Sequence, residues 1–197
     1  MAKYKLSDIF PGNYPISQYF GANPNYYKKF GLAGHEGVDW ALPTGTKLLA
    51  PFDNNIVIRT GWDASYGYYV VVWDNVQRCA SWFCHLSRIY VTPGQRIKKG
   101  TVIGLSGNSG NTTGPHLHKG FVETDSYGNR LDRNNGYQGY KNVLSASLVY
   151  WVIYQLKQLA FALPKGKKPA QTPTEGKLTA EEVIAKDLAY QKTVFKA

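Results

Sequence analysis

The side chains best suited to chemistry in this chain are its histidines, of which the 197 residues contain four. They occur as His35, as His85 and as the pair His116 and His118. A lone histidine is more often structural than functional, so the arrangement matters more than the residue type. The run His116-Leu117-His118 is typical of a β-strand, in which residues i and i+2 point to the same face. We therefore expect both imidazoles of the pair to project into one site.

The segment 34–39 adds the imidazole of His35 and the carboxylate of Asp39. Two histidines and one aspartate make three nitrogen and oxygen ligands, which is the count of a catalytic zinc site, where a fourth position stays open. Such a centre can lower the pKa of a bound water and polarise a carbonyl. His85 and the remaining histidine of the 116/118 pair suit proton transfer, because the pKa of imidazole lies near neutral pH. Each pattern is weak alone, and together they indicate metal-assisted hydrolysis.

Four segments then point to a known family. They are residues 34–46 followed by Ala50, residues 83–87, residues 94–107 and residues 113–118. In order and spacing these segments resemble the lysostaphin-type (LytM-like) zinc metallopeptidases, over roughly residues 15–125. Residues 18–21 also resemble the strand by which the family's chain enters the fold.

The resemblance implies one Zn²⁺ per chain, held by His35, Asp39 and His118. It implies that His85 and His116 flank the attacking water as general base and as oxyanion or leaving-group partner, without saying which does which. The fold implied is mainly β: a small antiparallel β-sheet or barrel-like peptidase domain of the duplicated-hybrid-motif type, with C-terminal helices. The activity implied is hydrolysis of stem or cross-bridge peptides in bacterial peptidoglycan.

The chain departs from the family pattern directly after His118. Lys119-Gly120 stands where the family commonly has Phe-Glu, and the period of two places Lys119 on the opposite face of its strand from His118. No zinc or proton-transfer group is lost, which favours an enzyme. The alternative is a non-catalytic protein that keeps the peptidase fold, as a cell-wall-binding or phage tail structural component.

These residues need a β-rich scaffold to position them. Short apolar runs separated by turn signals predict strands within residues 1–142. The expected strands are 47–50, 56–59, 68–73, 79–85, 101–105 and 116–123. The glycine-rich loop 106–114 has no phosphate-binding ending, so we expect it to form a wall of the substrate groove. Cys79 and Cys84 lie five residues apart on opposite faces of one strand, which predicts two buried free thiols.

Beyond the β domain, residues 143–163 predict an apolar helix packed on the domain or on a partner. Polar residues past its middle, including Lys157, argue against a membrane span. Pro164 ends this helix, and residues 164–177 predict a flexible linker. Residues 178–197 predict an amphipathic helix or tail, with Thr179 and Glu182 in capping-box spacing.

The formal charge of the chain is +10, and residues 1–163 carry sixteen basic and nine acidic side chains, a net charge of +7. A basic surface attracts nucleic acid, anionic lipid or anionic cell-wall polymers. No recognition helix or aromatic RNA-binding pattern accompanies the charge, so we expect neither a nucleic-acid partner nor membrane association. Peptidoglycan is the expected partner.

The first residues are polar and show no secretory signal peptide. An enzyme that acts at the cell wall would then need another route to its substrate. We therefore expect a bacteriophage protein, either virion-associated or released from the host cytoplasm by lysis. In the first case the C-terminal helices would dock into tail or other virion proteins.

Overall fold

The computed structural model describes residues 9–132 and 134–144. Nine strands and two short helical segments form in this part of the chain. The strands are β1 (Ile16–Gln18), β2 (Gly37–Trp40), β3 (Lys47–Leu49), β4 (Asn55–Asp63), β5 (Gly67–Asp74), β6 (Cys79–Ile89), β7 (Arg96–Ile97), β8 (Val102–Ser106) and β9 (Leu117–Glu123). The helical segments are α1 (Pro24–Tyr27) and the 3₁₀ turn η2 (Lys28–Phe30).

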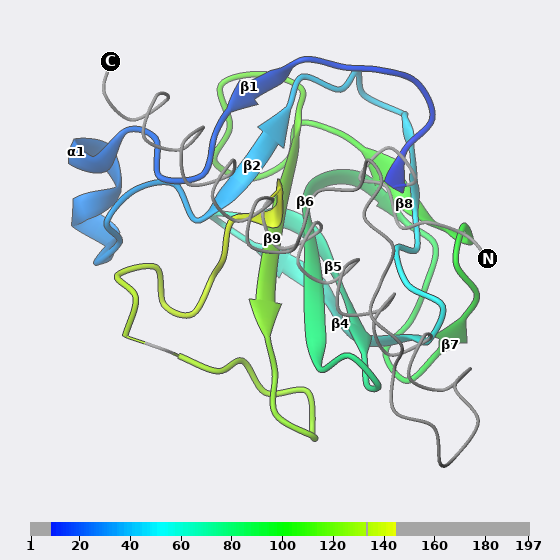
Figure 1. The fold of residues 1–197 in the computed structure, drawn as a ribbon. Helices are drawn as coiled ribbons and strands as arrows, with labels where there is room; N and C mark the ends of the chain where they lie inside the picture. Colours follow the sequence, from blue (N-terminus) through cyan, green and yellow to red (C-terminus); the bar gives the residue numbers. More distant parts are fainter. Residues whose placement is uncertain (1–8, 133, 145–197) are drawn as a thin grey trace, which may run out of the picture. The chain divides into compact units, whose positions relative to one another are not determined.

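All nine strands belong to one sheet, in which the pairings are antiparallel (Figure 1). Its main path runs β1-β2-β9-β6-β5-β4-β7, while β3 pairs with β8 and β8 with β6. The mainly antiparallel β fold expected from the sequence is confirmed.

Strand β6 is the branch point of this sheet. Its first half pairs with β9 as far as Cys84 opposite His118. Its second half pairs with β8, beginning with Leu86 opposite Ser106. His85 lies between the two pairings and has a φ of 61°. The branch therefore brings one predicted catalytic histidine to the place where β6, β8 and β9 meet.

Apolar side chains fill both faces of the central strands. On one face Phe83 of β6 packs with its β9 neighbour Lys119, while on the other Val71, Ala80, Val122 and Tyr140 form a cluster. Because β2 and β9 are covered on both sides, every residue of β2 is buried and only Glu123 of β9 is not. Polar side chains on these two strands therefore meet in a site that is shielded from water.

The six expected strands are confirmed, with shifts of a few residues at their ends. The entry strand expected at 18–21 lies earlier in the chain, as β1, which ends at Gln18 and pairs with β2. The chain turns at Gly21, which has a φ of 81°. The sequence patterns missed β2, β7 and the helical turn that begins at Pro24. Pro24 has the restricted φ that suits the first position of a helix.

Both cysteines are buried and free, as predicted. Cys79 and Cys84 pair with Glu123 and His118 of β9 respectively, so they lie on opposite faces of the sheet.

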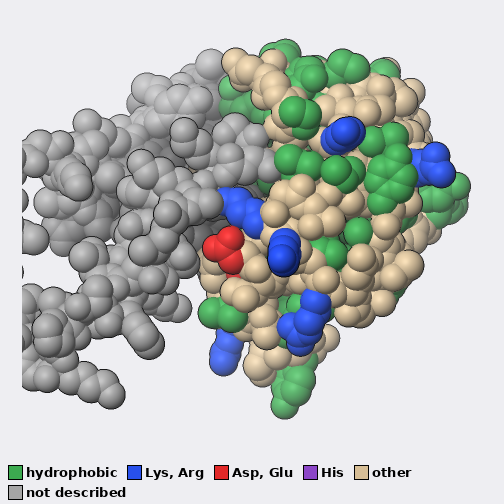
Figure 2. All heavy atoms as spheres, turned by 90° about the vertical axis from the view of Figure 1, so that its right-hand side faces the viewer, with side chains coloured by type: hydrophobic (Ala, Val, Ile, Leu, Met, Phe, Trp, Pro, Cys, Tyr) green, Lys and Arg blue, Asp and Glu red, His purple; other side chains and the backbone are tan. Residues whose placement is uncertain are grey.

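Lys and Arg side chains are scattered over the face shown in Figure 2, rather than gathered into one patch. No histidine is visible on the coloured part of that face. Within residues 9–132 and 134–144, no helix is both long and apolar enough to cross a membrane. The predicted helix at 143–163, apart from residues 143 and 144, lies outside the described residues, as do the linker at 164–177 and the tail at 178–197.

Candidate metal centre and catalytic groove

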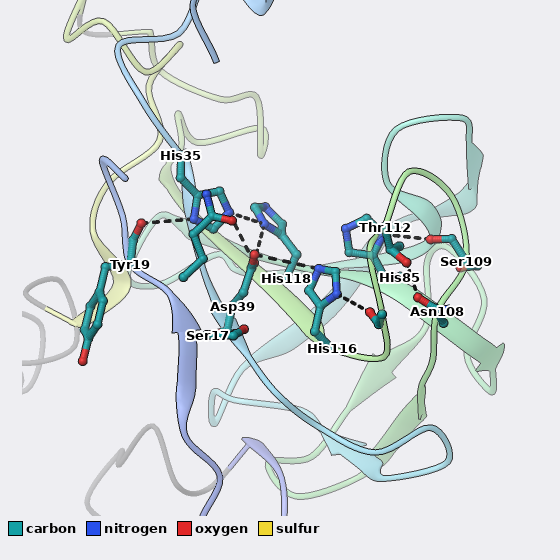
Figure 3. Close-up of polar contacts among 12 residues, drawn as sticks. Ser17, Tyr19, His35, Asp39, His85, Asn108, Ser109, Thr112, His116 and His118 are labelled. Carbon is teal, nitrogen blue, oxygen red and sulfur yellow. Dashed lines mark hydrogen bonds and ion pairs between the residues drawn. The ribbon is translucent and has the colours of Figure 1, made fainter. Parts of the chain in front are cut away.

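Three side chains that were predicted to bind a metal converge beside the branch of the sheet. Asp39 on β2 lies directly opposite His118 on β9, and His35 lies two residues before β2 begins. Asp39 Oδ1 is 3.0 Å from His118 Nδ1 and 3.2 Å from His35 Nε2, and the two nitrogens are 2.9 Å apart (Figure 3). All three residues are buried. Antiparallel pairing thus joins positions that are 79 residues apart in the chain.

The donor atoms of these three residues fit a zinc ion. A tetrahedral zinc site with bonds of about 2.0–2.1 Å has ligand atoms roughly 3.3 Å apart, close to the distances found here. Two imidazoles and one carboxylate are also a donor set typical of zinc. Gly37 leaves room for this arrangement, because a Cβ there would come within 2.5 Å of His118 Cε1.

A backbone carbonyl orients the imidazole of His35. Its Nδ1 lies 3.2 Å from the carbonyl oxygen of Tyr19, so an Nδ1–H donated there leaves the Nε2 lone pair facing Asp39. This is the arrangement by which a second partner fixes the tautomer of a metal-binding histidine. His118 instead presents Nδ1 to the cluster, and within the described part of the chain its Nε2 has no hydrogen-bond partner.

The electrostatics of the cluster favour an ionised carboxylate. Burial by itself raises the pKa of Asp39, but the close contacts of its carboxylate with His118 and His35 outweigh burial and bring that pKa below its ordinary value. Burial lowers the pKa of His118, and the hydrogen bond to Asp39 more than compensates, so that pKa is raised. Asp39 is therefore available as an anionic ligand.

The two other predicted histidines share one pattern of contacts. His85 Nδ1 lies 2.8 Å from the Ser109 carbonyl, and His116 Nδ1 lies 2.8 Å from the Gly114 carbonyl (Figure 3). An Nδ1–H donated to each carbonyl leaves Nε2 as a proton acceptor. The two rings are 4.6 Å apart between centroids, and His116 Nε2 is 3.8 Å from Asp39 Oδ2.

The pKa of His85 is lowered to about 4. Burial is the main cause, and the neighbouring His118 and His116 add to it. His85 is therefore a neutral imidazole at pH 7 and can accept a proton.

A groove of about 590 Å³ runs over this centre, and all four histidines and Asp39 line it. One wall is the aromatic segment that contains Tyr26, Tyr27 and Phe30, and another is the loop from Asn111 to Pro115. The latter confirms that part of the glycine-rich loop borders the groove. Asn111 Nδ2 lies 3.2 Å from the Tyr26 hydroxyl, so the walls touch.

Sequence reasoning missed further residues of the groove. Glu36 is 5% exposed, and its Oε1 accepts a 3.0 Å hydrogen bond from the Tyr66 hydroxyl. Burial is the main cause of the raised pKa of Tyr66, which keeps its hydroxyl protonated as a donor. Neither residue carries a pattern that separates it from a surface glutamate and a sheet tyrosine. All five predicted site residues nevertheless come together, and their individual roles stay predictions.

Known proteins share both sequence and fold with this chain. Residues 33–132 match Peptidase family M23. The chain is 39% identical over 87 residues to the peptidoglycan DD-endopeptidase ShyA of Vibrio cholerae, covering 44% of this chain and 20% of that protein. It is 32% identical over 146 residues to the glycyl-glycine endopeptidase ALE-1 of Staphylococcus capitis, covering 59% of this chain and 39% of that protein. The chain thus spans well under half of these relatives.

Among solved structures, the catalytic domain of the antimicrobial peptidase lysostaphin from Staphylococcus simulans superposes with a TM-score of 0.56. The match has 24% identity and covers 69% of this chain and 93% of that domain, so it supports the fold alone. LytU aligns with a TM-score of 0.52 and 28% identity, over 66% of this chain and 82% of its own. The profile match spans just over half of the chain and includes all five site residues, so the chain belongs to Peptidase family M23.

Proposed function

We propose that this protein is a zinc-dependent endopeptidase that hydrolyses peptide bonds in the stem or cross-bridge peptides of bacterial peptidoglycan. The observation that carries the proposal is the cluster of His35, Asp39 and His118 at 2.9–3.2 Å. Beside it lie His85 and His116, whose Nδ1 atoms are each 2.8 Å from a backbone carbonyl. Two relatives in the family bear names of peptidoglycan or glycyl-glycine endopeptidases, which supports the same substrate class.

His35 Nε2, Asp39 Oδ1 and His118 Nδ1 would hold the zinc ion. When bound, zinc supplies Lewis acidity: it lowers the pKa of a coordinated water and polarises the carbonyl of the scissile peptide. Asp39 would offset part of the metal charge, and burial of the three ligands excludes competing water from all but the groove side.

The two remaining histidines would divide the proton transfers. His85 is neutral at pH 7, and its Nε2 can take the proton of the attacking water. His116 Nε2 lies 3.8 Å from Asp39 Oδ2, on the groove side of the cluster. A protonated His116 can donate a hydrogen bond to the developing oxyanion or a proton to the leaving amine. The groove walls, including Tyr26, would hold an extended peptide between them.

Hydrolysis of purified peptidoglycan tests this function. Intact protein should release peptide fragments, and mass spectrometry of those fragments identifies the bond that is cut. A zinc chelator, or the substitution His118→Ala, should remove this release. Tyr127, 83% exposed, provides the control Tyr127→Ala, which should stay active. Release of the same fragments by His118→Ala would contradict the mechanism, while binding without cleavage by the unaltered protein would support a non-catalytic role.

We also propose that the protein acts at the bacterial cell wall, in line with the peptidoglycan-directed relatives. Its expected association with virion proteins rests on segments beyond residue 144, which the structure does not describe, and stays a prediction. A chain truncated at Pro164 should keep hydrolysis but fail to enter phage particles. Loss of hydrolysis on truncation would instead make those segments part of the peptidase fold.

A further inference from the structure

The hydroxyl of Ser109 lies between two strands of the sheet. Strands β5 and β6 pair regularly from Asp74 opposite Cys79 to Val70 opposite Phe83, and then the register shifts. At Tyr68 opposite Leu86, just beyond the shift, Ser109 Oγ accepts a 2.9 Å hydrogen bond from the Tyr68 amide. The same hydroxyl donates a 2.7 Å bond to the Leu86 carbonyl. A side chain from a different loop therefore bridges the ladder at its irregular point.

His85 directly precedes this bridge and is held in an uncommon backbone conformation. Its φ of 61° is in the left-handed region, which costs a non-glycine residue on the order of 1–2 kcal/mol. Such a conformation persists only when the surroundings fix it. The His85 amide donates a 2.8 Å bond to the Tyr66 carbonyl, and its ring Nδ1 donates a 2.8 Å bond to the Ser109 carbonyl. Ser109 thus binds Leu86, the residue after His85, through its hydroxyl, and the His85 ring through its backbone carbonyl.

The Ser109 backbone is also packed tightly against the turn between β4 and β5. A Cβ added at Gly67 would overlap the Ser109 carbonyl and side chain. The Asn111 amide donates a 3.2 Å bond to the Ser65 carbonyl. Because the loop rests directly on this turn, a shift of Ser109 would move the carbonyl that receives the His85 ring.

We infer that Ser109 is a positioning residue for His85: its hydroxyl bridges Tyr68 and Leu86, and its carbonyl thereby holds the His85 ring as the Nδ1–H tautomer with Nε2 facing the groove. The inference rests on the proposed peptidase function only for its catalytic consequence. Ser109 is not among the residues that line the groove, so it would act through His85. Removal of the hydroxyl lets the Ser109 backbone shift, so its carbonyl no longer fixes the orientation and tautomer of the His85 ring. Transition-state stabilisation then falls while substrate binding persists.

Steady-state kinetics of the full-length, zinc-loaded protein separate positioning from general stability. Ser109→Ala should lower kcat by about 10- to 100-fold, since small misplacements of a catalytic group cost this much. KM should stay within about twofold, because substrate binding does not depend on His85. Ser109→Thr keeps the hydroxyl and should restore most of kcat. The matched control is Ser87→Ala, which removes a 2.7 Å hydroxyl bond to the Ser106 carbonyl at the base of the same loop and should leave kcat unchanged.

A second readout does not depend on activity. Nitrogen NMR of the imidazole rings should find His85 as the Nδ1–H tautomer in the unaltered protein and in Ser109→Thr, and as a tautomer mixture in Ser109→Ala. Zinc content should be equal in all variants. If Ser109→Ala does not fold, Ser109→Cys, a weaker donor and acceptor, takes its place.

An unchanged His85 tautomer in the alanine variant would overturn the inference, as would a fall in kcat that follows zinc loss. Failure of the unaltered protein to cleave any peptidoglycan would refute the proposed function, while the NMR comparison would still decide the role of Ser109.

Discussion

Strand β9 buries a polar side chain on each of its faces, and the two side chains have very different contacts. His118 Nδ1 meets Asp39 and His35 at 3.0 and 2.9 Å. Its neighbour Lys119 is fully buried on the other face, where Nζ lies 4.2 Å from the centroid of the Phe83 ring. Among the described residues this ammonium has no hydrogen-bond partner. A buried polar group without such a partner costs folding free energy, so one face carries an organised site and the other a destabilising charge.

The contrast distinguishes two consequences of burying a polar side chain. On the His118 face, burial strengthens the electrostatic interactions that a metal centre requires. On the Lys119 face, burial is the main cause of a pKa lowered to about 7. The cation–π contact with Phe83 offsets part of that burial cost. Substitutions on the first face should therefore remove function, and a substitution on the second should add stability.

The largest effect is expected on the His118 face. Asp39→Asn replaces the anionic ligand with a neutral amide of the same shape. It should leave the protein largely without zinc and lower peptidoglycan hydrolysis at least about 1000-fold. Metal analysis and fragment release measure the two losses. Asp53 is exposed, and Asp53→Asn is the matched control. Full zinc content in Asp39→Asn would mean that the carboxylate is not a ligand.

The next effect, of opposite sign, is expected on the Lys119 face. Lys119→Met keeps the length of the side chain and removes the charge, so the free energy of unfolding at pH 7 should rise by about 1–4 kcal/mol. Chemical denaturation measures it. Lys141→Met is the control, because Lys141 is partly exposed and paired with Glu123 at 2.6 Å; it should give no gain. A loss of stability in Lys119→Met would mean that the ammonium has a favourable role in the core.

The side chains on these two faces also show which contacts the sequence could predict and which it could not. The spacing of two within His116-Leu117-His118 is a local property, so strand periodicity was sufficient to place both rings on one site. Residue type and count indicated Asp39 as a ligand, but only the family motifs indicated that its partner is His118. Their pairing depends on the register between β2 and β9. The opposite orientation of Lys119 followed from the same periodicity.

The unpredicted features depend on tertiary contacts. Periodicity says nothing about how deeply Lys119 is buried, because that depends on what packs over the strand. Glu36, Tyr66 and Ser109 have ordinary residue types for their local positions, and their contacts join segments 23 to 41 residues apart. The branch of β6 at His85 likewise arises from pairing with two different strands. Local sequence patterns carry no signal for any of these.

The free energy of unfolding should also depend on pH through the buried Lys119. A lysine has a pKa of about 10.4 in the unfolded chain, against about 7 for folded Lys119. Between these values the unfolded state binds more protons, so stability rises with pH. The cost of Lys119 is therefore complete below pH 7 and disappears near pH 10. The stability advantage of Lys119→Met should shrink between pH 6.5 and 9.5; a constant advantage would assign it to packing instead of charge.

The smallest effect is expected from the two thiols, one on each face. Burial raises the pKa of Cys79 and of Cys84 above the ordinary thiol value, so neither should react in the folded protein at pH 8, while the unfolded chain should react at both. Any slow labelling then reports transient opening, whose frequency falls as stability rises. Lys119→Met should slow labelling of Cys79, which shares its face, by the factor that corresponds to its gain in stability. Equal slowing at Cys84 would indicate that the two faces open together, and faster labelling of Cys84 than of Cys79 would show that the metal-site face opens first.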